Sequence, residues 1–466
     1  MFGTPPYGGA IAQNVYYADS DLCDPTIDTT GGYPTRPNNE PWPTPYILMV
    51  DRGSCTFVKK VRNAQRAGAA GVIIADNTCL CEDAECVSRS GTGQCETSEP
   101  IMADDGSGAD VSIPSFLMFK NDADKIKQEL KEKNNPVQIE MAWSLPNPDG
   151  RVEYDLWTVP TDNLGKSFLK SWKPMAMALG KDAYFTPHQY IYDGLRTHCV
   201  GEDGENFCYN LCTNHGRYCA TDPDNDLDKG ISGADVVKEE LRRLCIWNKY
   251  GEDGIGEQFW DYLDFFYSKC DNQDFFMSED CARDAMKHSG VDANIIQMCM
   301  DDSGGLEENK SNSRLDAEIA AQNARGIVIL PSAFVNTAAI RGQLSSNSMF
   351  HAICAGFAEG SEPEICMQCG KCSDAVSCVL TKGVCSGSSI PSGVPKGSVS
   401  THTFAFWMFF VVAAFGGVGY WHYNKTREDM REQVRGILAE YMPLEDQDAG
   451  GAMDFASKGG TVPLFS

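Results

Sequence analysis

Cysteines are the residues with the most evident chemistry in this sequence, with 20 among 466 residues. Six lie between Cys23 and Cys95, nine between Cys199 and Cys354, and five between Cys366 and Cys385. Disulfide bonds persist in secretory and extracellular compartments and are rare in the cytosol. We therefore expect the chain up to Cys385 to be lumenal and disulfide-bonded. Because the second and third groups are both odd in number, one bridge is expected to join them.

Two cysteine-rich stretches offer thiols that could instead bind a metal. CLCEDAECVSRSGTGQC, at 79–95, lacks the paired CxxC knuckles of a zinc site. CMQCGKC, at 366–372, has the close spacing of an iron–sulfur or zinc site. An oxidising lumen favours disulfides over metal in both stretches. We therefore assign no metal to them.

An acidic stretch, DPDNDLDKG at 222–230, invites a calcium interpretation. Three aspartates alternate from 224 to 228, as in an EF-hand loop. The sixth loop position is Lys229, however, where the turn needs glycine, and the twelfth is Asp235 rather than glutamate. A solvated acidic loop is therefore favoured over a calcium site, and no cofactor is expected.

Signals of catalysis are missing from the sequence. It contains no HExxH, no GxSxG, and no CxxC in a catalytic context. Lys plus Arg number 39 against 65 Asp plus Glu, a formal charge of −26 that repels phosphate backbones. We therefore expect neither an enzyme nor a nucleic-acid-binding protein. A membrane-anchored enzyme of the secretory pathway, either thioredoxin-like or a protease bearing an accessory domain, remains the alternative class.

A first domain is expected over residues 1–145. Its pattern predicts a buried strand at 45–50, an amphipathic helix at 56–67 and a second buried strand at 70–75. Gly53 allows a sharp turn after the first strand, where Arg52 offers a planar fork of donors for a peptide's carbonyl or carboxylate groups. The alternative is that Arg52 only pairs with a neighbouring acid such as Asp51 or Asp76.

A second domain is expected over residues 150–360. Strands are predicted at 151–159 and 182–192, helices at 233–247 and 314–325, and a strand, a proline and another strand at 326–336. This order resembles a thioredoxin-like fold, and Pro331 is the candidate for the cis-proline of that fold. Oxidoreductases on this fold need a CxxC at the first helix, but no cysteine occurs from 159 to 198. Redox catalysis is therefore not expected.

The remaining residues predict a membrane anchor. A short Cys-rich segment at 366–385 and a Ser/Gly/Pro linker at 386–403 precede FAFWMFFVVAAFGGVGYWHY, at 404–423, which is long enough to cross a bilayer. Lysine and arginine residues follow the span directly, so residues 424–466 are predicted to be cytosolic. Such a type I topology needs a signal peptide, and none is evident at the start, so we expect the N-terminus to be incomplete. The fold class is therefore α+β multidomain with one transmembrane helix.

Several stretches resemble known families. VDRGSCTFVKKVRNAQRAGAAGVIIADN and IPSFLMF resemble the protease-associated domain, a lid or ligand-binding module. FTPH, NHGRYCATDPD, WDYLDFFYSKC, ILPSAFVN and CAGFAEGSEPEIC follow in the order seen in plant vacuolar sorting receptors. The resemblance implies a cargo groove that binds sorting peptides of soluble vacuolar or lysosomal proteins. The residues that it places in the groove are Arg52, Gly53, Ser54, Cys55, Ile113, Pro114, Ser115 and Phe116.

Two further short motifs fit this resemblance. Tyr441, Met442, Pro443 and Leu444 form a Y-x-x-Φ motif in a segment, ILAEYMPL, that is similar to the receptors' tails, and this implies a clathrin adaptor as partner. Asn309 begins a glycosylation sequon that would lie in the lumen. The expected location is the Golgi, endosomal or prevacuolar and vacuolar membranes, with the N-terminus in the lumen.

Overall fold

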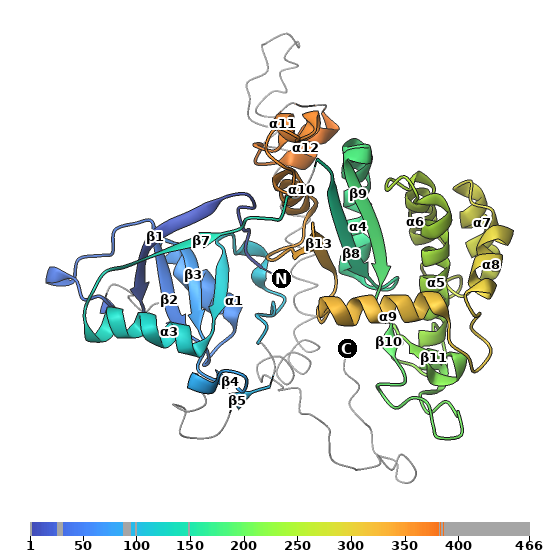
Figure 1. Ribbon diagram of the computed structural model, residues 1–466, viewed down its shortest axis with the longest axis horizontal. Coiled ribbons are helices and arrows are strands. Elements are labelled where there is room, and N and C mark those ends of the chain that lie inside the picture. Colours follow the sequence, from blue (N-terminus) through green and yellow to red (C-terminus); the bar gives the residue numbers. More distant parts are fainter. Residues whose placement is uncertain are drawn as a thin grey trace, which may run out of the picture. The chain divides into compact units, whose positions relative to one another are not determined.

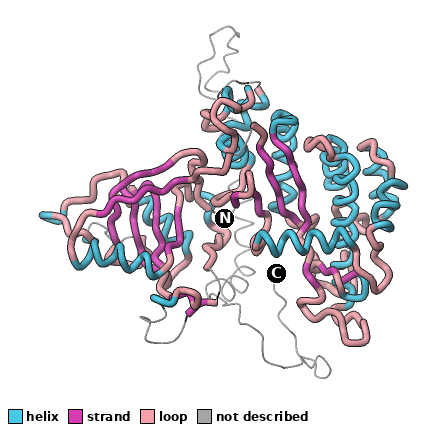
Figure 2. The backbone as a smooth tube through the Cα atoms, viewed as in Figure 1, coloured by secondary structure: helices cyan, strands magenta, loops and turns pink. Residues whose placement is uncertain are grey.

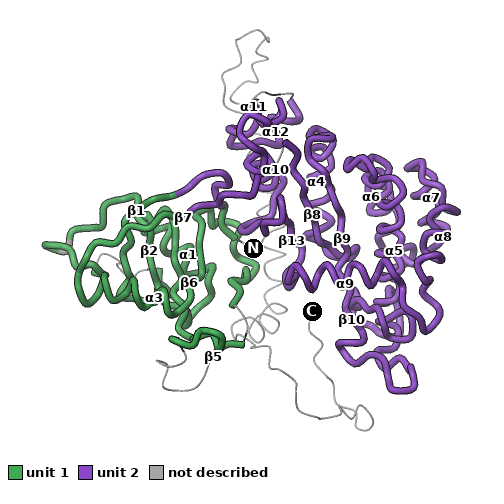
Figure 3. Tube along the Cα trace, in the orientation of Figure 1, with its two compact units in different colours: residues 1–4, 11–140, 387–455 green, residues 5–10, 141–386, 456–466 purple. Residues whose placement is uncertain are grey.

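The computed structural model describes residues 2–25, 31–86, 95–97, 100–147, 150–381, 383 and 385 (Figure 1). The chain divides into two compact units, which are drawn in different colours in Figure 3. Among the described residues, the first unit holds 2–4 and 11–140, and the second holds 5–10 and 141–385.

The first unit is built on a five-stranded sheet with the strand order β6-β3-β2-β1-β7. Strand β2 pairs in parallel with β1 and with β3, and β3 pairs in parallel with β6. The carboxyl ends of these four strands therefore meet at one edge of the sheet. The elements of this unit are β1 (Ala10–Tyr17), β2 (Tyr46–Asp51), α1 (Phe57–Arg66), β3 (Ala69–Ala75), β4 (Cys79–Leu80), β5 (Cys95–Glu96), β6 (Ser115–Met118), α3 (Lys120–Lys127) and β7 (Val137–Ala142).

Helix α1 packs its apolar face against this sheet. Thr56 caps its N-terminus by accepting a hydrogen bond from Lys59 N at 3.3 Å. Val58, Val61 and Ala64 are fully buried in the same core as Leu48 and Val72 of the central strands. The strand, helix, strand order predicted from the sequence is confirmed, with each element within two residues of its expected bounds.

The second unit contains a four-stranded sheet with the order β14-β13-β8-β9 (strands magenta, helices cyan in Figure 2). Strands β8 and β9 are parallel, and β13 is antiparallel to β8. Short strands β10, β12 and β11 form a second sheet. The elements are β8 (Val152–Thr158), α4 (Asn163–Leu179), β9 (Ala183–Gln189), β10 (Tyr192–Asp193), β11 (Cys212–Thr213), β12 (Tyr218–Cys219), α5 (Gly233–Tyr250), α6 (Glu257–Lys269), α7 (Glu279–His288), α8 (Ala293–Asp302), α9 (Ser313–Arg325), β13 (Ser332–Val335), β14 (Ala338–Ala339), α10 (Ser346–Ala355), α11 (Glu364–Cys369) and α12 (Ala375–Leu380).

Of the two strands predicted at 326–336, the structure contains only the second. Residues after Pro331 form β13, but residues 326–330 form a turn and loop instead of the expected strand. Gly326 ends α9 in the left-handed conformation, at φ 62°, which glycine adopts without steric cost. Ile327 packs with Trp157 and Phe334, whereas Val328 is 62% exposed. The apolar residues before Pro331 therefore belong to a loop and not to a strand.

Disulfide bonds join all 20 cysteines in pairs. The predicted bridge between the second and third cysteine groups is confirmed as Cys354–Cys366. It links the end of α10 to α11, and Cys369 and Cys378 are fully buried in the core of the second unit. The disulfide interpretation of both cysteine-rich stretches is therefore confirmed.

The predicted membrane span at 404–423 and the cytosolic segment at 424–466 lie outside the described residues. Among the residues that are described, no helix is both long enough and apolar enough to cross a bilayer. The span and its orientation therefore stay predictions from the sequence.

Candidate functional site

The turn after β2 lies at the carboxyl edge of the sheet in the first unit. We call residues 52–55 the Arg52 loop. Gly53 has φ 107° and Ser54 has φ 68°, so the chain reverses here through backbone conformations that favour glycine. Both residues are exposed. Cys55 is bonded to Cys23, which holds the end of the loop against the preceding segment.

The Arg52 guanidinium is held between two carboxylates. Its Nη1 lies 3.0 Å from Asp76 Oδ1 and 2.7 Å from Glu96 Oε1. The Arg52 side chain is only 10% exposed, and that of Asp76 is 1% exposed. The alternative interpretation, in which Arg52 pairs with a neighbouring acid, therefore holds for Asp76. This pairing fixes the base of the loop and leaves the exposed backbone of Gly53 and Ser54 at its tip.

Asp51, the other acid considered for Arg52, has partners of its own. Tyr17 donates its hydroxyl to Asp51 Oδ2 at 2.6 Å, and Lys127 Nζ of α3 lies 2.6 Å from Oδ1. Burial raises the pKa of the Asp51 carboxyl, but the bonds from Lys127 and Tyr17 outweigh it and lower the pKa below its ordinary value. Asp51 is therefore a charged group at the sheet edge that α3 neutralises.

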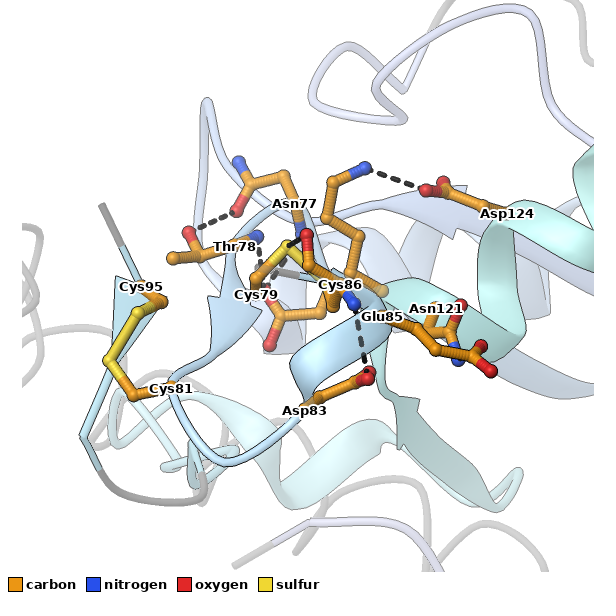
Figure 4. Close-up of a disulfide and its surroundings, with 12 residues drawn as sticks. Asn77, Thr78, Cys79, Cys81, Asp83, Glu85, Cys86, Cys95, Asn121 and Asp124 are labelled. Carbon is orange, nitrogen blue, oxygen red and sulfur yellow. Dashed lines mark hydrogen bonds and ion pairs between the residues drawn. A yellow bond between two sulfur atoms is a disulfide. The ribbon is translucent and has the colours of Figure 1, made fainter. Parts of the chain in front are cut away.

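Glu96 reaches Arg52 because two disulfides fold the segment after β3 back on itself. Strands β4 and β5 pair in parallel with Cys79 opposite Cys95. Figure 4 shows the Cys81–Cys95 bridge that joins these strands, and Cys86, bonded to Cys79, on the adjoining turn. Sequence reasoning missed Glu96, which is 44 residues from Arg52. The only sequence signal for it was its position directly after Cys95.

The segment 113–116 does not lie beside the Arg52 loop. In β6, Phe116 is opposite Ile73 of β3, which in turn is opposite Met49 of β2. Arg52 is three residues further along, or about 10 Å at the rise of a strand. Ile113 and Pro114 precede β6 and lie further away still, and Gln65 at the end of α1 accepts a hydrogen bond from Ile113 N at 3.2 Å. The structure therefore does not bring all eight predicted groove residues to one place.

Phe116 and Phe119 offer apolar surface along β6. They are 36% and 39% exposed. Strand β6 is the last strand of the sheet order, so in the described part of the chain no strand of this sheet pairs with its side away from β3. An extended peptide can add to such an edge, with alternate side chains contacting the sheet. Of the predicted segment, Ser115 and Phe116 are the residues on this edge.

In the second unit, an aspartate caps the helix that follows strand β8. Asp162 caps α4, accepting hydrogen bonds from Leu164 N at 3.1 Å and Gly165 N at 2.7 Å. The Leu330–Pro331 bond is cis, as the sequence pattern suggested for Pro331, and Ser332 pairs with Trp157 of β8. Thiol activation at a helix N-terminus requires a cysteine there, and no cysteine occurs from 159 to 198, the stretch that contains the start of α4.

Of the other predicted sites, Asn309 belongs to the second unit. Asn309 is exposed in the loop before α9, and its Oδ1 accepts a hydrogen bond from Arg217 Nε at 3.1 Å. An exposed loop position is where a glycan can be attached. Tyr441, Met442, Pro443 and Leu444 fall outside the described residues.

Comparison with known proteins agrees with this architecture. A family described as "Vacuolar sorting receptor thioredoxin-like domain" matches residues 152–354, and one described as "PA domain" matches residues 11–126. Vacuolar-sorting receptor 1 of Pisum sativum is 34% identical over 386 residues, covering 78% of this chain and 57% of the pea protein. Vacuolar-sorting receptor 7 of Arabidopsis thaliana is 35% identical over 399 residues, covering 82% of this chain and 60% of that protein. Among solved structures, DsbA from Mycobacterium tuberculosis aligns with a TM-score of 0.29 and 10% identity over 52% of this chain and 95% of that one.

The chain is thus a protein with a protease-associated (PA) domain followed by a thioredoxin-like domain. In these two domains it is of the plant vacuolar-sorting-receptor type, so the resemblance stated from the sequence is confirmed. The chain spans 57% to 60% of the length of the two curated relatives named above.

Proposed function

We propose that this chain is a type I transmembrane receptor that binds sorting peptides of soluble vacuolar or lysosomal hydrolases in the lumen. The observation that carries the proposal is the match of both domains, in order, to proteins named as vacuolar-sorting receptors. The start of α4 carries no cysteine, which supports binding rather than redox catalysis at that helix.

The PA domain is the proposed site of cargo binding. A tip of exposed backbone at Gly53 and Ser54, braced by the Cys23–Cys55 bridge and by the buried Arg52 pair, can offer hydrogen bonds to an extended peptide with little loss of its own entropy. The outer edge of β6, the last strand in the sheet order, provides a second contact through Ser115 and Phe116.

Arg52→Ala is expected to weaken binding of such a peptide at least about tenfold, because the loop then loses the ion pairs that hold it. The measurement is fluorescence anisotropy of a labelled hydrolase sorting peptide with the full chain in detergent. The matched control is Arg62→Ala, which breaks another arginine–carboxylate pair of the same domain, to Asp110 at 2.7 Å. This control should bind within about twofold of the unmodified chain.

A second variant separates binding from folding, because Arg52→Ala leaves Asp76 buried without this partner. Ser54→Gln adds bulk at the exposed tip and leaves the ion pairs of Arg52 in place. This variant should also weaken binding of the peptide. If Arg52→Ala and Ser54→Gln both bind as tightly as the unmodified chain, the Arg52 loop is not part of the cargo site.

The tail is proposed to recruit a clathrin adaptor through Tyr441, Met442, Pro443 and Leu444, for transport between the Golgi and an endosomal or vacuolar compartment. This requires the span at 404–423 to place residues 424–466 in the cytosol. Protease added to sealed Golgi vesicles should then remove those residues and spare residues 1–385, as read with one antibody to each part. Digestion of residues 1–385 with survival of the tail would contradict the proposed topology.

A further inference from the structure

The loop that precedes α5 contains a buried acid that a solvated acidic loop does not explain. We call residues 222–231 the Asp222 loop. Asp226 and Asp228 are exposed, as the sequence interpretation expected, but Asp222 is only 8% exposed. Asp235, the twelfth position of the EF-hand pattern, accepts hydrogen bonds from Ser232 N at 2.9 Å and Ser232 Oγ at 2.6 Å. Asp235 therefore belongs to the capping box of α5, and the EF-hand pattern does not apply.

The two oxygens of the Asp222 carboxyl have different surroundings. Oδ1 accepts hydrogen bonds from Asp224 N and Asn225 N, both at 3.0 Å. Oδ2 is buried and, within the described part of the chain, accepts no hydrogen bond. Apart from its own burial, the group that acts most strongly on the Asp222 carboxyl is the Asp224 carboxyl, and both of these effects raise the pKa of Asp222. Within the described residues, the Asp222 carboxyl thus has one buried oxygen without a donor and a second acid as its neighbour.

The Asp224 carboxyl is held in place at this point. Its Oδ1 accepts a hydrogen bond from Asp226 N at 3.0 Å, and its Oδ2 accepts one from Ile231 N at 3.2 Å. A Cβ at Gly230 would fall 1.8 Å from Asp224 Oδ2, and Gly230 has φ 79°, so only glycine fits there. The backbone therefore closes around the Asp224 carboxyl and fixes it beside Asp222.

A neutral oxygen lies against the same loop. Asn210 Nδ2 donates a hydrogen bond to Leu227 O at 2.6 Å, which orients the amide. Asn210 Oδ1 is buried and, among the described residues, has no hydrogen-bond partner. A buried carboxylate oxygen without a donor is unfavourable, and two adjacent carboxylates add repulsion. A cation between the two carboxylates would remove both costs.

We propose that Asp222 and Asp224 bind a calcium ion in the Asp222 loop. Calcium takes six to eight oxygen ligands in flexible geometry, and carboxylates and amide or backbone carbonyls supply them in proteins. An irregular loop of this composition suits calcium better than magnesium, which requires near-ideal octahedral geometry. The bound ion would fix the loop that leads into the Ser232 cap of α5.

The first test is isothermal titration of the full chain in detergent, stripped with EDTA, with CaCl2 and then with MgCl2. Asp222→Asn keeps an acceptor for the two backbone N–H groups and removes the charge. This substitution should lower the affinity for calcium at one site at least about tenfold. The matched control, Asp228→Asn, makes the same charge change in the same loop at an exposed side chain. Its affinity for calcium should stay within about twofold of that of the unmodified chain.

The second test reads the loop itself by hydrogen exchange of peptides that cover residues 211–232. Calcium should slow exchange in the unmodified chain and in Asp228→Asn, and it should have no effect in Asp222→Asn. In EDTA, without calcium, Asp222→Asn should exchange more slowly than the unmodified chain. The reason is that the substitution removes the repulsion between the carboxylates of Asp222 and Asp224. Equal calcium protection in Asp222→Asn and the unmodified chain, or no protection in either, would overturn the site. Equal protection by magnesium would overturn the choice of calcium.

Discussion

Glu239→Gln is expected to lower the free energy of opening of helix α5 by about 3 to 5 kcal/mol, the usual cost of removing one partner from a buried ion pair. Glu239 is fully enclosed in the second unit. Its Oε2 lies 2.6 Å from Arg242 Nη1, and its Oε1 lies 2.9 Å from Arg243 Nε. Tyr262 of α6 donates its hydroxyl to the same carboxylate at 3.0 Å. One carboxylate therefore serves two arginines and a tyrosine.

The reason for so large an effect is that Arg243 has no second carboxylate. Its side chain is 1% exposed, and among the described residues Glu239 is the only acid within ion-pair distance of it. Its Nη1 donates to Tyr267 at 2.7 Å, and the guanidinium lies 4.9 Å from the centre of that ring. These contacts orient the cation but do not neutralise it. Arg242 differs, because Glu279 lies 2.8 Å from its Nη2.

Hydrogen exchange of peptides covering residues 233–250 measures this effect for the second unit alone, whereas bulk unfolding would average over both units. Glu252→Gln is the control, since it makes the same substitution at an exposed side chain close to the end of the helix. The control should change the opening free energy by less than about 0.5 kcal/mol. A similarly small change in Glu239→Gln would mean that Arg243 does not depend on this carboxylate.

Local patterns predicted a helix with one buried face and strands that are buried on both faces. Helix α1 has its apolar residues at helical spacing beside charged ones, and the buried strands β2 and β3 read as continuous apolar runs. Helix α6 could not be recognised in this way. Its buried residues Phe259, Tyr262 and Leu263 follow helical spacing, but the half-buried Phe265 and Tyr267 are aromatic too, so the sequence shows no single apolar face.

Long-range pairing explains what sequence reasoning missed at the candidate sites. The loop around Arg52 and its possible pairing with Asp76 follow from local order along the chain, because both residues come directly after a strand. Glu96 joins them only because Cys81 bonds to Cys95, and sequence alone does not determine disulfide pairing. In the same way, the acidic spacing at 222–230 is visible in the sequence, but the burial of Asp222 is not.

Glu240, the residue after Glu239, is expected to act in the opposite direction. It is fully buried, and within the described residues neither carboxyl oxygen has a hydrogen-bond partner. Burial raises its pKa well above the ordinary value; Arg243 opposes this shift, and Glu318 and Glu239 add to it. The folded chain therefore keeps a proton on Glu240 at a pH where the unfolded chain has released it. Since the folded-state pKa is the higher one, this contribution to stability is full below the unfolded-state pKa and is lost as pH rises toward the folded-state value.

Glu240→Met replaces the acid with an apolar side chain of similar length, and we expect it to stabilise α5 by about 1 to 3 kcal/mol at pH 7.5. Near pH 4.5 the gain should shrink, because the unfolded chain then also holds much of its proton. Hydrogen exchange of the same peptides at the two pH values, corrected for intrinsic rates, measures the difference, with Glu252→Gln again as control. A loss of stability at pH 7.5 comparable to that of Glu239→Gln would show instead that Glu240 is ionised and neutralises Arg243. The two adjacent glutamates therefore predict effects of opposite sign from one helix, since only Glu239 has partners for its charge.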